Sequence, residues 1–169
     1  MRKLLTGFIL TLLLAACGFQ LRGVASLPFE SLYVDGGGNP ALAAEISRAI
    51  RSGTQTRLTD KAADAQAVLQ VPGATREKRI LALSGAGRVR EYELIYHVGF
   101  RLLDKEGRDL MAAQPIELRR AMLYDDAQVL AKEQEEVLLY RDMQNDVLGQ
   151  LMRRLAAAKL QPADAPAQR

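Results

Sequence analysis

The N-terminal segment constrains this chain most, because it combines an export signal with the only cysteine. Two basic residues precede an apolar run over 4–14, and two alanines then lead into Cys17. This order of charge, apolar run and small residues is typical of a secretory signal, and the run is shorter than the ~20 residues that span a bilayer. A cysteine directly after Leu-Ala-Ala resembles the bacterial lipobox. We therefore predict that residues 1–16 are removed and that Cys17 carries lipid.

Lipidation of Cys17 leaves no thiol to pair, so the fold must hold without disulfides although an exported protein can form them. The roughly 150 residues after the signal are enough for one domain with its own core. One acyl chain anchors a protein only reversibly, whereas two or more hold it firmly. The N-terminus thus predicts a domain fastened to a membrane by lipid. The alternative is an ordinary signal followed by a buried cysteine without lipid.

The charge of the chain is balanced once the signal is discounted. The full sequence has 23 basic and 20 acidic residues, and loss of Arg2 and Lys3 leaves a net charge of +1. No strong overall field remains that would attract a polyanion. We predict no nucleic-acid partner.

Composition along the chain predicts a single folded body. We expect a lipidated tether over 17–31, one domain over 32–160, and a disordered tail over 161–169 that contains two prolines. No linker divides the body in two.

Periodicity and turn residues predict the elements. Asn39 before Pro40 indicates a helix start, and an apolar stripe continues to Gly53. Pro115 favours an edge strand or a bulge. Extended segments are predicted at 32–34, 56–59, 67–71, 79–84, 91–102 and 110–124.

A long helix is predicted at the C-terminus, capped by Asp125 or Asp126 and running to about Leu160. At ~50 Å it would be longer than a small domain is wide, so we expect part of it to project or to lie along a partner. The elements together predict an α+β fold, with two helices packed on one face of a mainly antiparallel sheet of about four strands.

Residues typical of catalytic or metal sites are scarce. The only histidine, His97, lies on the less apolar face of a predicted strand, and no acidic loop has calcium spacing. Segment 84–87 lacks the phosphate-loop pattern and is interpreted as a turn, and Asp125 and Asp126 are explained by helix capping. We predict no enzyme activity, no metal and no cofactor, with a hydrolase of unusual chemistry as an alternative.

Basic residues around the 84–87 turn are the strongest candidates for ligand binding. Arg88 and Arg90 are expected to share one strand face, close to Lys78 and its basic neighbours on the preceding strand. Arginines beside exposed apolar groups suit a phosphorylated lipid, since guanidinium binds phosphate in a bidentate manner. The residues alone leave open a solvated hairpin whose cations only protect a sheet edge.

Five short segments follow one another in a recognisable order, at 17–23, 90–94, 119–125, 129–133 and 150–155. Each is short, so only the ordered set is specific. Together they resemble the LptE family of LPS-assembly lipoproteins, and the resemblance covers nearly the whole mature chain.

This resemblance implies a plug inside the outer-membrane β-barrel LptD, forming the translocon that inserts lipopolysaccharide (LPS) into the outer leaflet. It also implies direct LPS binding, help in barrel assembly, and lipid anchoring at the periplasmic side of the outer membrane, which fits Gly18 after the lipidated cysteine. Lys132, Arg90 and Arg88 are our candidates for LPS contacts. The alternatives are another outer-membrane lipoprotein that assists barrel assembly, or a periplasmic lipid carrier.

Overall fold

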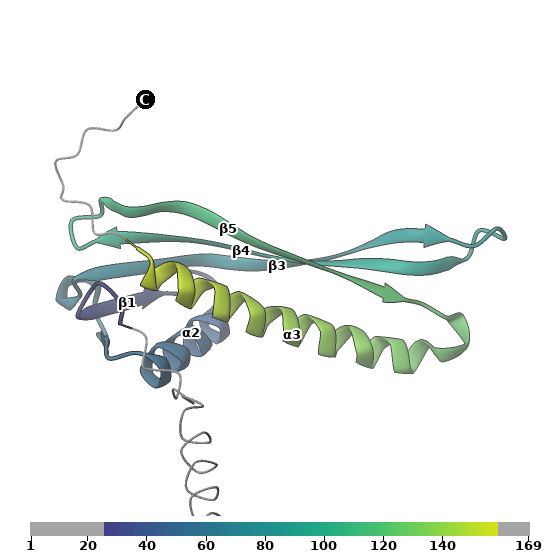
Figure 1. Ribbon diagram of the computed structural model, residues 1–169, viewed down its shortest axis with the longest axis horizontal. Coiled ribbons are helices and arrows are strands. Elements are labelled where there is room, and N and C mark those ends of the chain that lie inside the picture. The colour runs from purple at the N-terminus through teal and green to yellow at the C-terminus, as the bar shows by residue number, and fades with distance from the viewer. Residues whose placement is uncertain (1–25, 159–169) are drawn as a thin grey trace, which may run out of the picture.

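The computed structural model describes residues 26–158, in which two α-helices cover one face of a five-stranded sheet (Figure 1). The predicted α+β fold with a long C-terminal helix is confirmed, whereas Cys17 and the tail at 161–169 lie outside the described residues. The strands are β1 (Ser31–Asp35), β2 (Arg57–Leu58), β3 (Ala67–Leu83), β4 (Val89–Asp104) and β5 (Asp109–Leu123). The helices are α2 (Pro40–Gly53) and α3 (Val129–Ala156), with 3₁₀ turns η1 (Ala62–Asp64) and η2 (Asp126–Gln128).

The sheet has the strand order β2-β1-β3-β4-β5. The three long strands β3, β4 and β5 form an antiparallel meander, whereas β1 runs parallel to both of its neighbours. The sheet thus has five strands, against the four or so expected, and the two-residue β2 lies within the extended segment predicted at 56–59. Phe29 is only 2% exposed and β1 begins at Ser31, so the folded domain starts before residue 32.

A single strand, β3, replaces two predicted ones. We expected segments 67–71 and 79–84 to be separated at Pro72, but the strand continues through it. Its register against β4 shifts between Gln70 and Gly73. At such a bulge a proline removes no ladder hydrogen bond, so it interrupts the pairing without ending the strand.

Helix α2 forms as predicted. The side chain of Asn39 accepts a hydrogen bond of 3.0 Å from the backbone N–H of Leu42, and Pro40 is the first helical residue. Leu42, Ile46 and Ile50 are buried against the sheet. The cap and the i, i+4 spacing together explain why this segment is helical.

Helix α3 begins two or three residues later than predicted. Asp125 instead caps the 3₁₀ turn η2, where its Oδ1 accepts a hydrogen bond from Ala127 N–H at 2.9 Å. The helix has 28 residues, ~42 Å, and lies along strands of 15 to 17 residues, ~50 Å. The predicted projection is therefore wrong, because the meander is as long as the helix (Figure 1).

The two ends of the sheet differ in what covers them. At the end with β1 and α2, which we call the proximal end, the core is aliphatic and aromatic: Leu32, Ile46, Leu69, Phe100 and Leu151 are each at most 2% exposed. At the other end, the distal end, lie the turn 84–87, the end of β5 and the start of α3. There α3 alone accompanies the meander (Figure 1).

One edge strand of the sheet is β5, as Pro115 predicted. Pro115 has no N–H, and its carbonyl accepts a hydrogen bond of 3.1 Å from the guanidinium of Arg154 on α3. Further along, the carbonyl of Arg119 accepts a bond of 3.0 Å from Arg120. Two arginines and a proline thus occupy edge groups that another strand would need.

Candidate functional site

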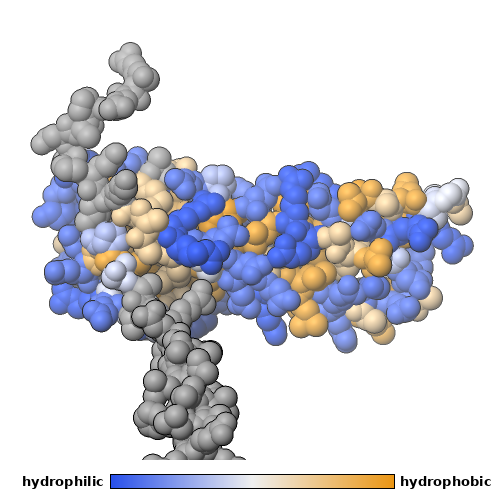
Figure 2. Space-filling view, in the orientation of Figure 1, coloured by the Kyte–Doolittle hydropathy of each residue, from blue (hydrophilic) through white to orange (hydrophobic). Residues whose placement is uncertain are grey.

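Large apolar side chains are exposed toward the distal end of the molecule. They belong to the last residues of β3 and β5 and to the first turns of α3, and orange groups stand out among blue ones in that half of Figure 2. Contiguous exposed apolar surface marks binding sites more often than ordinary protein surface. Within residues 26–158 these side chains are Ile80, Leu81, Leu83, Leu123, Val129, Leu130, Val137 and Leu138.

The three predicted LPS-binding cations come to this end from different elements. Arg90 is on β4, where its carbonyl accepts a hydrogen bond of 2.8 Å from Tyr124 N–H, and Lys132 is in the first turn of α3. Arg88 lies one residue before β4 begins, and its carbonyl accepts a hydrogen bond of 2.7 Å from Ser84 N–H at the base of the turn. Within residues 26–158, neither arginine forms an ion pair.

Lys78 lies between the β3–β4 hairpin and α3. Its ammonium is 2.6 Å from Glu136 Oε2 on α3, and it lies 4.3 Å from the ring centre of Tyr92 and 5.9 Å from that of Tyr124. The two rings contact each other edge to face, with centroids 5.0 Å apart. One ammonium is therefore held by a carboxylate and two aromatic rings, an arrangement in which both kinds of contact favour the cation.

Lys132 lies one turn before Glu136 on the same side of α3, because residues four apart share a helix face. Its side chain is only 17% exposed and its ammonium pairs with Glu135 Oε2 at 2.8 Å. The cations of the distal end thus include two lysines with internal partners and two arginines without one among the described residues.

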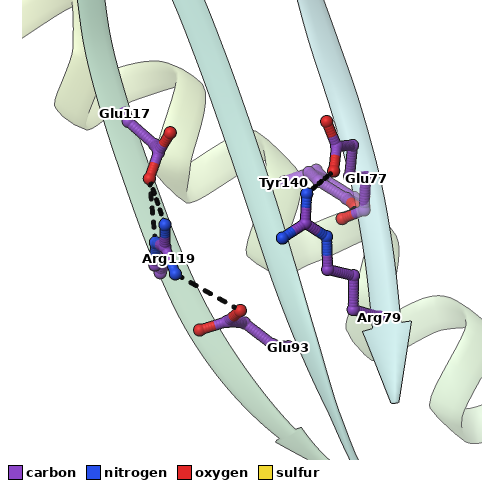
Figure 3. Close-up of polar contacts among 6 residues, drawn as sticks. All are labelled: Glu77, Arg79, Glu93, Glu117, Arg119 and Tyr140. Atoms are coloured by element: carbon purple, nitrogen blue, oxygen red, sulfur yellow. Dashed lines mark hydrogen bonds and ion pairs between the residues drawn. The ribbon is translucent and has the colours of Figure 1, made fainter. Parts of the chain in front are cut away.

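The opposite face of the meander carries a network of charges (Figure 3). Arg119 on β5 bonds Glu117 at 2.7 Å and also contacts Glu93 on β4 at 3.6 Å, and Arg79 pairs with Glu77 on β3 at 2.5 Å. The hydrogen bond with Glu117 raises the pKa of Arg119 above its ordinary value. Positive and negative groups alternate, so this open face is polar but nearly neutral.

His97 belongs to this open face, in register with Thr75 on β3 and Glu117 on β5. In the part of the chain from 26 to 158, no cluster of three or more His, Cys, Asp or Glu side chains could hold a metal ion. The segment 84–87 is a turn, with Gly87 at a positive φ of 77°.

Lys78 is not among the binding residues predicted from the sequence, although it lies beside the basic turn considered there. The available signal was its spacing, since Arg76, Lys78 and Ile80 alternate along one strand face. This face meets α3: Arg76 lies 5.2 Å from the ring centre of Tyr140. A long strand through Pro72 was not expected, and without it the facing helix could not be assigned.

None of the helices in the described region is both long and apolar enough to cross a membrane. Residues 29–155 match the family described as "LptE: Lipopolysaccharide-assembly". The chain is also similar to the "LPS-assembly lipoprotein LptE" of Yersinia pestis (strain Pestoides F), with 29% identity over 157 residues that cover 87% of this chain and 75% of that protein.

Solved lipoprotein structures share the fold. The solution structure of an uncharacterized lipoprotein B from Nitrosomonas europaea is 44% identical, with a TM-score of 0.74 over 83% of this chain and 91% of that one. The rare lipoprotein B from Shewanella oneidensis is 30% identical, with a TM-score of 0.64 over 75% and 94% of the two chains. A minor lipoprotein from Acinetobacter baumannii, 23% identical, has a TM-score of 0.65 over 82% and 99% and supports the fold alone.

Proposed function

Since this chain belongs to the LptE family of lipopolysaccharide-assembly proteins, we propose that it is an outer-membrane lipoprotein that binds LPS. We also propose that it plugs an LptD-like β-barrel and helps to assemble it. Lipid on Cys17 would anchor this chain on the periplasmic side of the membrane. Mass spectrometry of the mature N-terminus tests the anchor. A diacylated Cys17 is expected, and an unmodified thiol would contradict it.

The observation that supports LPS binding is the coincidence of cations and exposed apolar groups at the distal end. Arg90 and Lys132 reach this end from β4 and α3, and Leu83 and Leu130 are 56% and 76% exposed there. LPS offers phosphates and acyl chains in one molecule. Cations bind the first and apolar side chains the second.

Charge reversal tests this assignment. The Lys132→Glu/Arg90→Glu variant should bind purified LPS about tenfold or more weakly than the wild type at matched low salt, because two attractive contacts become repulsive. The matched control is Arg57→Glu/Lys61→Glu, which makes the same charge change at exposed residues of the proximal end. Equal affinity of the two variants would exclude a distal LPS site.

The barrel partner is supported by charge and by anchoring. A wide barrel has a polar lumen, and the mature chain is charged yet near neutral at +1. Lipid anchoring raises the effective concentration of the domain beside a membrane protein. Affinity purification from outer membranes should recover a large β-barrel protein in equal amount, identified by mass spectrometry. Recovery of this protein without a barrel would contradict the proposal that it plugs one. Recovery as a free protein loaded with lipid would favour the alternative of a periplasmic lipid carrier.

A further inference from the structure

Two neighbouring carboxylates on α3 each hold one lysine of the distal end. Glu135 pairs with Lys132 at 2.8 Å, and Glu136 pairs with Lys78 at 2.6 Å. The first pair lies within α3, whereas the second joins α3 to β3. Both lysines are thus already neutralised in the free protein by partners that belong to the same helix.

The Lys78 ammonium would keep its position without Glu136. It is 4.3 Å from the centre of the Tyr92 ring and 5.9 Å from that of Tyr124. The two rings contact each other edge to face, with their centroids 5.0 Å apart. Tyr124 is in turn fixed by its backbone hydrogen bond of 2.8 Å to Arg90. The backbone of Tyr124, whose ring contacts Lys78, is therefore hydrogen-bonded to the backbone of Arg90, one of the candidate LPS-binding arginines.

We propose that Lys78 is a further phosphate-binding residue of the distal site, and that Glu136 is an internal counter-ion which a phosphate of the ligand replaces. In the same way, Glu135 is the internal counter-ion of Lys132, and a phosphate of the ligand replaces it. This inference rests on the proposed LPS-binding function. It adds Lys78 to the binding residues of the site. It also implies that competition between a glutamate and a ligand phosphate for each lysine sets the affinity for LPS.

The exposure of the pair makes this exchange feasible. The side chains of Lys78 and Glu136 are 34% and 23% exposed, and ion pairs that solvent reaches are weak. A phosphate carries more charge than a carboxylate and offers more acceptor oxygens, so it competes well for the three donors of a lysine. The released Glu136 can turn to water, whereas Lys78 stays on its aromatic rings.

The competition predicts opposite effects for the two members of one pair. Lys78→Gln should weaken binding of purified LPS about tenfold, the effect of losing one charge-assisted contact. Glu136→Gln should strengthen it about two- to fivefold, the range expected for removing a partly exposed competing ion pair. Lys78→Arg should retain most of the affinity, because it keeps the cation.

A matched control separates local competition from general charge. Glu133→Gln makes the same change of charge on the same helix, at an exposed residue that has no ion pair within residues 26–158. It should leave affinity nearly unchanged. LPS treated with phosphatase should lose the gain seen with Glu136→Gln, and thermal unfolding of each variant checks that it is folded.

The outcomes distinguish the two proposals. If Glu136→Gln binds no more tightly than Glu133→Gln, or if both Lys78→Gln and Glu136→Gln weaken binding, the pair is structural and this inference is wrong. If the Lys132→Glu/Arg90→Glu variant binds like the wild type, the distal LPS site itself fails. Should Lys78→Gln not fold, the comparison of Glu136→Gln with Glu133→Gln still decides.

Discussion

The hydroxyl of Tyr140 on α3 donates a hydrogen bond of 2.6 Å to the main-chain carbonyl of Glu77 on β3. Tyr140 lies between two parts of α3 that pack against the sheet in different ways. Toward the proximal end α3 contributes Met143, Val147 and Leu151, each at most 1% exposed. Toward the distal end it contributes Glu136, whose contact with the sheet is the ion pair with Lys78. The long helix is therefore held by an apolar core at one end and by polar contacts at the other.

Removal of this hydroxyl should destabilise the fold modestly. Tyr140→Phe keeps the ring but loses the hydrogen bond to Glu77, which we expect to lower the free energy of unfolding by ~1 kcal/mol. Urea denaturation at neutral pH measures the difference. The control is Tyr33→Phe, because the Tyr33 hydroxyl has no hydrogen bond among the described residues. Equal stability of the two variants would contradict the prediction.

Alkaline pH should weaken the fold through two tyrosines. Burial raises the pKa of Tyr96 and of Tyr140 above the ordinary value of 10.0. The unfolded chain then loses these protons at a lower pH than the folded one, so the stabilisation is complete below pH ~10 and is lost as pH rises through the folded-state pKa values. Thermal unfolding followed from pH 8 to 11.5 should show a falling midpoint above pH ~10. A smaller fall of the unfolding midpoint in the Tyr140→Phe variant would show how much of the pH effect comes from Tyr140.

Gly36 is expected to tolerate no side chain. A Cβ there would overlap the Cβ of Ala43 in α2 and crowd the carbonyl of Asn39, whereas a Cβ at Gly38 would meet no atom within 4 Å. Gly36→Ala should therefore lower the free energy of unfolding by ~1–3 kcal/mol, the typical cost of overpacking. Gly38→Ala, two residues away, is the control and should be far less affected. Chemical denaturation measures the free energy of unfolding of both variants. Similar losses of stability in the two would contradict the prediction.

The protected edge of β5 should keep the domain from pairing with itself. In Pro115→Val/Arg154→Ala an amide hydrogen is restored and the Pro115 carbonyl loses its guanidinium partner. We expect self-association that increases with concentration, because an open strand edge is a template for another strand. Sedimentation velocity measures it. Pro115→Val/Arg153→Ala restores the same amide without freeing the carbonyl, and equal association of both variants would assign the protection to Pro115 alone.

Local patterns predicted much of the fold. The Asn39 cap, the alternation after Tyr92 and the turn glycines at 87 and 107 depend on neighbours within a few residues, and each appears as expected. The continuity of β3 through Pro72 was missed, because whether a proline ends a strand or lies at a bulge depends on the register of the partner strand. The start of α3 was misplaced, because Asp125 caps a 3₁₀ turn there.

The α+β class and the family resemblance could be predicted from the residues alone, whereas the export signal ending at Cys17 and its lipid stay predictions. The sequence also placed Arg90 and Lys132 in segments expected to bind a ligand, an assignment that stays a prediction. That these residues approach the same end, and that Lys78 lies there with Glu136 and two tyrosines, becomes apparent only in the three-dimensional fold. The reason is physical. These contacts join β3 to a helix more than fifty residues away, and such pairing depends on register and packing that no local pattern encodes.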